Sequence, residues 1–207
     1  NPGLKAILRK HAAQWARSSL PVIVHLMAGK VNEAGGVQHL SEMVNLLERV
    51  EGVTAVEVGL PPDVDGESAR AYARAASGEL PVILRLPFEQ ALGLARGLAS
   101  NAADAGFPAA ERSGAGASVA EALAVEIAAI SLAPPRGAVS TARGELLHGR
   151  LYGPALFPQS LELVHALAGT GLPVIASGGV SRPEQVEAML SAGAVAVQVD
   201  SALWWGG

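Results

Sequence analysis

The sequence predicts an α/β fold of the TIM, or (β/α)8, barrel class, with six βα units visible in its 207 residues. Three observations support this prediction. Short apolar segments alternate with helical patterns, glycines follow the ends of several segments, and no G-x-G-x-x-G turn follows the first one. An open doubly wound sheet also satisfies the alternation, but a dinucleotide-binding sheet would need that glycine-rich turn. A full barrel has eight units, so we expect the first two to precede Asn1.

Six continuous segments rich in Val and Ile are typical of buried parallel strands. Gly or Pro bounds them, and three of them open with Pro-Val-Ile. Proline is tolerated there because the first residue of a strand need not donate a hydrogen bond. The strands predicted in this way are 21–27, 53–59, 81–86, 127–133, 173–177 and 194–199.

Helical patterns lie between these segments. Residues 38–50 place their Leu, Met and Val side chains largely on one face, and 160–168 and 182–191 behave similarly. Pro183 suits the first turn of a helix. Strand and helix therefore alternate along the chain, which predicts a parallel sheet with right-handed crossovers.

One segment, 100–118, fits neither pattern, because it is rich in Ala, Gly and Ser and has little periodicity. It lengthens the connection between the third and fourth strands to roughly 40 residues, where a crossover needs about a dozen. We interpret it as a mobile surface insertion, with a lid over the site as the alternative. The remainder, within 1–207, is predicted to be a single partial barrel domain.

Composition excludes several classes of protein. Half of the residues are apolar and 16% are charged, so the chain can bury a core and is not disordered as a whole. A net charge of −4 argues against nucleic-acid binding. No apolar run reaches the roughly 18 residues of a membrane span. With no cysteine there is no disulfide or thiolate nucleophile.

The beginning of the chain is unusual, because Asn1-Pro2-Gly3 carries no Met and no basic, apolar leader follows it. We interpret this as a chain whose beginning was removed or not recorded. The composition and the missing leader predict a cytoplasmic protein that acts on a small-molecule substrate. The sequence leaves open whether the protein forms a homo-oligomer.

The strongest local signal for chemistry is residues 173–180, PVIASGGV. Gly178 and Gly179 end a predicted strand and leave main-chain N–H groups uncovered by any Cβ. These groups, with the N-terminus of the following helix, predict a phosphate site, and barrels commonly bind phosphate after their last two strands. A tight turn alone is the simpler alternative. Gly153, which precedes another helix, could add an N–H to the same phosphate.

Three segments in this order resemble the C-terminal third of the dihydroorotate dehydrogenase family. They are 153–155 (GPA), 174–180 (VIASGGV) and 192–199 (AGAVAVQV). Residues 1–4, 57–64 and 81–86 also resemble segments of this family. The resemblance covers nearly the whole chain except 100–118 and is most specific from Tyr152 onward.

The resemblance implies a (β/α)8 barrel with FMN at its C-terminal face and a place in pyrimidine biosynthesis. Family enzymes pass a hydride from dihydroorotate to FMN while a Cys or Ser base takes a proton. The residues implied to bind FMN are Arg85, Gly153, Ser177, Gly178, Gly179, Asp200 and Ser201.

The chain departs from the family at its substrate site. Leu60-Pro61 stands at the position of the base, and neither residue accepts a proton. Gly59, Asp63 and Ala133-Pro134 replace asparagines that hold the pyrimidine, so that substrate would lose several hydrogen bonds of about 1–3 kcal/mol each. Arg85 replaces a lysine and keeps its positive charge. We therefore expect an altered substrate pocket.

The catalytic residue is unknown from the sequence, and His148 is the candidate that we name. It lies in a glycine-interrupted loop, 142–152, from which it could swing over the flavin. His25 lies within a strand, where a packed, hydrogen-bonded histidine is the simpler interpretation. Asp63 and Arg136 are candidate substrate contacts, with solvated surface positions as the alternative. The histidine spacings indicate no metal site.

The sequence thus predicts an FMN-dependent oxidoreductase resembling dihydroorotate dehydrogenase, which transfers a hydride between a small organic substrate and bound FMN without the usual Cys or Ser base. A non-catalytic flavin- or phosphate-binding barrel is the alternative. A third hypothesis is an unrelated barrel enzyme that acts on a phosphorylated small molecule.

Overall fold

The computed structural model describes residues 3–27, 29, 36–104 and 127–200. The chain divides into two compact units, Asn1–Arg85 with Leu123–Ala128 and Leu86–Ala122 with Ala129–Gly207. Each unit has three parallel strands with helices between them, and each is described by itself. The prediction of six parallel strands alternating with helices is confirmed.

The first unit is built on three strands in the order β1-β2-β3, namely β1 (Val22–Met27), β2 (Val53–Gly59) and β3 (Val82–Leu86). Both pairings are parallel, and the register sets His25 opposite Glu57 and Gly59 opposite Arg85. β2 is buried at five of its seven positions, as expected for a strand covered on both faces.

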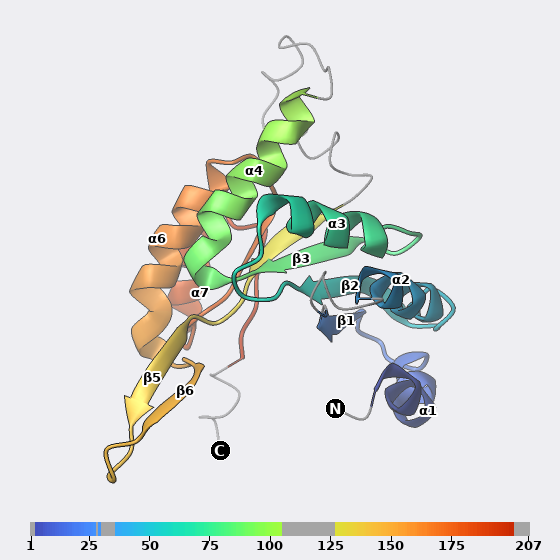
Figure 1. Ribbon diagram of the computed structural model, residues 1–207, viewed down its shortest axis with the longest axis horizontal. Coiled ribbons are helices and arrows are strands. Elements are labelled where there is room, and N and C mark those ends of the chain that lie inside the picture. Colours follow the sequence, from blue (N-terminus) through green and yellow to red (C-terminus); the bar gives the residue numbers. More distant parts are fainter. Residues whose placement is uncertain (1–2, 28, 30–35, 105–126, 201–207) are drawn as a thin grey trace. The chain divides into compact units, whose positions relative to one another are not determined.

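The described part of this unit has three helices, α1 (Leu4–Trp15), α2 (Gly36–Leu47) and α3 (Gly66–Ala76). α2 and α3 pack against each other (Figure 1). Their buried side chains recur at helical spacing, so each helix turns one apolar face inward. These side chains are Leu40, Val44 and Leu47 of α2 and Ala69, Tyr72, Ala73 and Ala76 of α3.

Asp65 starts helix α3. Its side chain accepts a 2.7 Å hydrogen bond from the Ser68 N–H, a donor that the helix itself leaves unsatisfied. This hydrogen bond lowers the pKa of Asp65, because it favours the carboxylate. The stabilisation that the carboxylate provides is therefore present above its ordinary pKa and lost as the pH falls through the lowered value.

The second unit contains three parallel strands in the order β4-β7-β8, namely β4 (Ala129–Leu132), β7 (Val174–Ala176) and β8 (Ala196–Val197). The helices among its described residues are the 3-10 turn η1 (Phe88–Gln90), α4 (Ala91–Asp104), the 3-10 turn η3 (Pro154–Leu156), α6 (Phe157–Ala168) and α7 (Pro183–Ser191). α6 packs against both α4 and α7 (Figure 1). Fully buried side chains on β4, α6, β7 and α7 form the core of this unit.

A two-stranded antiparallel sheet, β5 (Arg136–Ser140) and β6 (Leu146–Arg150), extends away from the helices of the second unit (Figure 1). The prediction of a loop over 142–152 was therefore wrong, and His148 lies in a strand opposite Ala138. A tight turn makes the hairpin. Thr141 Oγ1 accepts hydrogen bonds from the N–H groups of Arg143 and Glu145, and Gly144 adopts a φ of 79°.

Several element ends differ from the sequence predictions. The helix expected to reach residue 50 ends at Leu47, and the last strand is only Ala196–Val197 instead of 194–199. α4 continues to Asp104, so the segment 100–118 begins as a helix. Residues 105–118 of that segment lie outside the described residues. Whether the segment is a mobile insertion or a lid stays a prediction.

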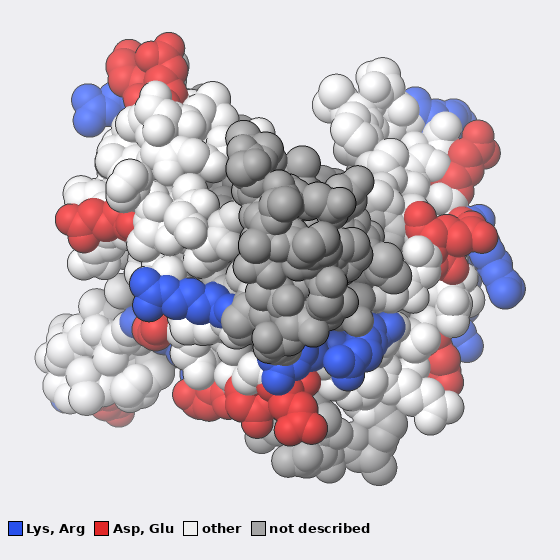
Figure 2. All heavy atoms as spheres, turned by 90° about the horizontal axis from the view of Figure 1, so that it is seen from above, with Lys and Arg blue, Asp and Glu red and all other residues white. Residues whose placement is uncertain are grey.

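Charged side chains of both signs are spread over the described part of the face shown in Figure 2. This distribution agrees with the sequence totals of 15 basic and 19 acidic residues. Within the described residues, none of the helices has the length and apolar character that crossing a membrane requires.

Burial predicts how much individual leucines contribute to stability. Leu132 in β4 is 1% exposed, whereas Leu147 in β6, within the same unit, is 59% exposed. We expect Leu132→Ala to lower the free energy of unfolding by about 2–5 kcal/mol through lost burial and a residual cavity. Leu147→Ala should change it by less than about 0.5 kcal/mol. Urea unfolding of both variants measures this, and equal losses would contradict the described core.

Candidate functional site

The turn after β7 lies directly against the start of α6. Gly178 and Gly179 adopt φ values of 106° and 75°, and Gly153 adopts 125°. A Cβ on Gly179 would lie 2.4 Å from the Phe157 nitrogen and 3.0 Å from the Gly153 oxygen, so only glycine fits there. The structure therefore brings together Gly153, Gly178 and Gly179, a group that we call the glycine cradle.

The N-terminus of α6, beside the glycine cradle, has no side-chain cap. Its N-cap residue is Leu156, whose side chain offers no acceptor. The Phe157 N–H donates to the Pro154 carbonyl and Pro158 has no N–H, so Gln159 carries the first main-chain N–H of this turn that could meet a ligand. That N–H and the helix dipole favour an anion. The following helix differs, because Gln185 Oε1 already accepts from the N–H groups of Ser181 (2.8 Å) and Arg182 (3.2 Å). The sequence predicts that following helix, α7, for the phosphate, and this stays a prediction.

Ser160, in the first turns of α6, gives a second indication of a ligand. Its side chain is fully buried, and its hydroxyl has no hydrogen-bond partner. A Cβ on Gly178 would lie 2.4 Å from Ser160 Oγ, so this hydroxyl adjoins the glycine cradle. Buried hydroxyl groups are nearly always paired in proteins, because an unpaired one costs about 1–3 kcal/mol.

The other residues that the sequence predicts to bind the cofactor are not part of the glycine cradle. Ser177 is buried, and its hydroxyl donates a 2.8 Å hydrogen bond to the Leu132 carbonyl, which ties the end of β7 to β4. Asp200 is half-buried beyond β8, while Ser201 lies outside the described residues. Arg85 belongs to the first unit. The roles assigned to these residues stay predictions.

A buried carboxylate lies at the centre of the first unit's strands. Glu57 on β2 is 4% exposed, and its Oε2 lies 2.7 Å from His25 Nδ1 on β1 and 3.3 Å from Arg85 Nη1 on β3. A charge at this depth needs such partners, because it has lost most of its hydration. Arg85 Nε is buried as well and has no partner.

His25 is held in one orientation by this arrangement. When Nδ1 donates to Glu57, Nε2 is left available for another partner, and the His25 side chain is 38% exposed. Gly59 makes room for the ring, because a Cβ there would lie 2.7 Å from Cε1 and 3.0 Å from Nε2. An imidazole that a carboxylate holds in a fixed orientation can transfer a proton.

Sequence reasoning named His25 and Arg85 separately and missed Glu57 as their common partner. A signal was present in the pattern. His25, Glu57 and Arg85 each occupy the fifth position of a predicted strand segment, PVIVH, VTAVE and PVILR. Consecutive parallel strands bring such positions near one another, so one ionisable residue in each apolar strand indicates a shared cluster.

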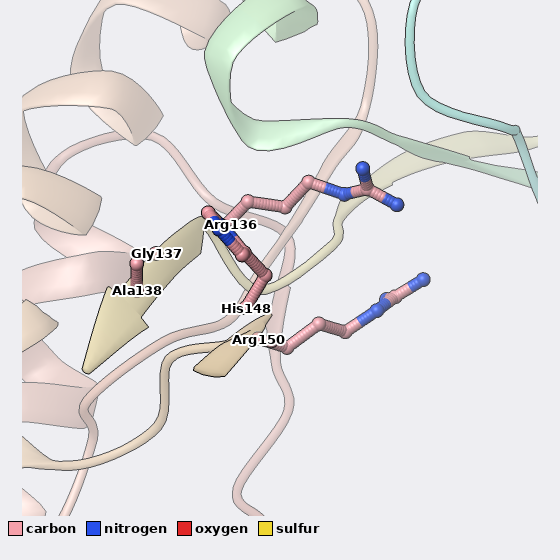
Figure 3. A pocket seen from close by; sticks show the side chains of 6 residues that line it. Arg136, Gly137, Ala138, His148 and Arg150 are labelled. Atoms are coloured by element: carbon pink, nitrogen blue, oxygen red, sulfur yellow. The ribbon is translucent and has the colours of Figure 1, made fainter. Parts of the chain in front are cut away.

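The remaining candidate site residues belong to different units of the chain. Asp63 is exposed in the first unit, between β2 and α3, with a left-handed φ of 60°. Arg136 and His148 both belong to the β5–β6 hairpin of the second unit, where they line one cavity together with Arg150 (Figure 3). Among the described residues, no group of three or more His, Asp or Glu side chains is placed to hold a metal ion.

Comparison with known proteins identifies similarity in the part of the chain that carries the glycine cradle. The family model described as nitronate monooxygenase matches residues 152–205. This range includes Gly153, Gly178 and Gly179. No match was found among curated protein sequences.

Two solved structures resemble the chain in fold. The first, DHODH (dihydroorotate dehydrogenase) from Eimeria tenella in complex with ferulenol, has a TM-score of 0.59 and 16% identity and covers 87% of this chain. The second, the tryptophan synthase A-subunit from Pyrococcus furiosus, has a TM-score of 0.52 and 19% identity and covers 95%. The chain spans 52% and 64% of their respective lengths.

These similarities establish the fold class, because both solved structures are TIM barrels. The expected (β/α)8 class is thus confirmed. Nitronate monooxygenases and dihydroorotate dehydrogenases are both FMN-binding proteins.

Two glycine substitutions distinguish the effect of steric crowding at the glycine cradle from the effect of backbone strain. Gly179 and Gly144 have similar φ values, 75° and 79°, but only Gly144 has open space around a new Cβ. We expect Gly144→Ala to lower the free energy of unfolding by about 1–2 kcal/mol through φ strain alone. Gly179→Ala should cost about 1–3 kcal/mol more, because the backbone of Phe157 must move. Urea unfolding checks this, and equal costs would contradict the close packing.

The Glu57–Arg85 pair should be strongly coupled. In a double-mutant cycle of Glu57→Gln and Arg85→Met, we expect a coupling energy of about 1–3 kcal/mol from urea unfolding, because either single variant leaves a buried polar group without its partner. The exposed His39–Glu42 pair, 3.7 Å apart in the same unit, is the control and should couple by less than about 0.5 kcal/mol. Similar values in the two cycles would contradict a buried cluster.

Proposed function

We propose that this chain forms part of an FMN-dependent oxidoreductase and binds the phosphate of FMN at the glycine cradle. The observation that carries the proposal is the uncapped start of α6 beside Gly153, Gly178 and Gly179. Main-chain N–H groups without side-chain cover suit a phosphate group. The nitronate monooxygenase family model includes these three glycines, which supports the proposal.

The residues of the second unit fit a phosphate in two respects. The Cβ positions of Gly178 and Gly179 are filled by Ser160 and by the backbone of Phe157, whereas a Cβ on Gly153 would meet nothing within 4 Å, so the open main chain of the cradle lies at Gly153. The buried Ser160 hydroxyl, which has no partner, supplies a further donor or acceptor beside Gly178. Asp200 and Ser201 follow in the chain order expected for the second half of such a site.

FMN, when bound, would supply hydride transfer to or from a small organic substrate. The chain's own residues would supply position and charge. Dihydroorotate is not the substrate that we propose, because Leu60-Pro61 offers no base and Ala133-Pro134 offers no amide. A barrel without catalytic activity is not favoured, since both similar families consist of oxidoreductases.

The proposal predicts that binding depends on the phosphate of the nucleotide. Two or more charge-assisted hydrogen bonds of about 1.5–3 kcal/mol each would be lost with riboflavin, which lacks the phosphate. We therefore expect FMN to bind at least about 100-fold more tightly than riboflavin. Quenching of flavin fluorescence on titration with the purified protein measures both affinities.

The control variants use the two glycines compared above. Gly179→Ala should weaken FMN binding and leave riboflavin binding nearly unchanged, whereas Gly144→Ala should bind both as the unaltered protein does. Equal affinities for FMN and riboflavin, or no binding of either, would contradict the proposal.

A further inference from the structure

Two arginines face each other on the β5–β6 hairpin. The antiparallel register sets Arg136 directly opposite Arg150, and Ala138 opposite His148. Directly opposed residues of an antiparallel pair project to the same face. Figure 3 shows the two arginine side chains extending toward the same side of the hairpin. Like charges in this arrangement destabilise the pair unless something neutralises them.

No described carboxylate neutralises these two guanidinium groups. Among the ion pairs of the described residues, neither Arg136 nor Arg150 has a partner. The nearest acidic contact is Glu89 Oε1, which accepts a 2.8 Å hydrogen bond from the backbone N–H of Arg136. Each guanidinium keeps five N–H donors in a planar fork, and both arginine residues are exposed.

A cavity of about 430 Å³ lies over the same residues. Its lining consists of Arg136, Gly137, Ala138, His148, Gly149 and Arg150. Ala138, two residues after Arg136 on the same face of the hairpin, has only a methyl side chain, whereas Gly137 and Gly149 lie on the opposite face. The volume is within the range of about 300–1,000 Å³ that is typical of small-molecule sites. His148 adds a third group that can donate a hydrogen bond.

We propose that Arg136 and Arg150 form a binding site for the oxyanion of a small-molecule ligand, a carboxylate or a phosphate. The planar forks of two guanidinium groups match the oxygens of either group in a bidentate manner. The bound anion would remove the repulsion between the arginines and join β5 to β6. This site shares no described residue with the glycine cradle, so the proposal stands or falls independently of FMN binding.

The site lies at the base of the hairpin. The Leu151 N–H donates to the Pro135 carbonyl (2.9 Å), which closes the hairpin beside the arginine pair. β4 ends at Leu132 just before this base, and Gly153 follows just after it. In barrels the loops after the strands carry the substrate contacts. An oxyanion held here is therefore suited to be part of a substrate.

Calorimetric titration of the purified protein with succinate and with inorganic phosphate tests the site. We expect one or both to bind, and the tighter probe identifies the preferred group. Arg136→Gln and Arg150→Gln should each weaken that binding at least tenfold, since one charge-assisted interaction is lost. Arg143→Gln, at the tip of the same hairpin, is the matched control and should leave the affinity unchanged.

Gly179→Ala separates this site from the glycine cradle, which could also take phosphate. Anion binding that survives Gly179→Ala and is lost in Arg136→Gln belongs to the hairpin, whatever the outcome for FMN. Binding that is lost in Gly179→Ala but kept in both arginine variants would overturn the proposal. Equal weakening by Arg143→Gln would overturn it too, because it would show a general effect of charge. No binding of either probe would also overturn it.

Thermal unfolding gives an independent readout. Without an anion, Arg136→Gln should unfold at the same or a higher temperature than the unaltered protein, because the repulsion with Arg150 is removed. With succinate, or with phosphate in the Gly179→Ala background, the unfolding temperature should rise when both arginines are present and stay nearly constant in the Arg136→Gln variant. Equal rises in both would contradict the arginine site.

Discussion

The close approach of the Gly178-Gly179 turn to the first residues of α6 is the constraint on which the account of this chain depends. A single Cβ at Gly179 would enter the space of the Phe157 nitrogen, so the contact needs a residue without a side chain. Beside this contact, the N-cap residue Leu156 gives α6 no side-chain cap, and the buried Ser160 hydroxyl has no partner. The close packing of the second unit and its proposed anion site therefore lie at the same place.

The two units provide different chemistry. The second offers uncovered main-chain donors and a pair of arginines, both suited to anionic groups. The first buries a carboxylate between a histidine and an arginine, which orients the imidazole of His25. A positively charged arginine and an oriented imidazole are typical of sites where charge or a proton moves. In both units, glycines at or after strand ends leave the space that these groups need.

Much of the fold could be predicted because buried parallel strands leave a strong pattern, and all six were found from runs such as PVIVHLM and VTAVEVG. The β5–β6 hairpin was missed because its strands are short, exposed and interrupted by glycine, so they carry no such pattern. Gly153, Gly178 and Gly179 were recognised as a group before the structure placed them together. Glu57 was missed as a site residue, because its role depends on strand register, and the sequence gives register only indirectly.

The most direct test of the central claim is an amide NMR titration of the protein with FMN and, in parallel, with riboflavin. If the glycine cradle holds the phosphate, FMN should shift the amide resonances of Gly153, Gly178, Gly179 and the first turn of α6, and riboflavin should leave them nearly unchanged. Shifts of these amides that are the same with both flavins, or FMN shifts confined to other residues, would contradict the account.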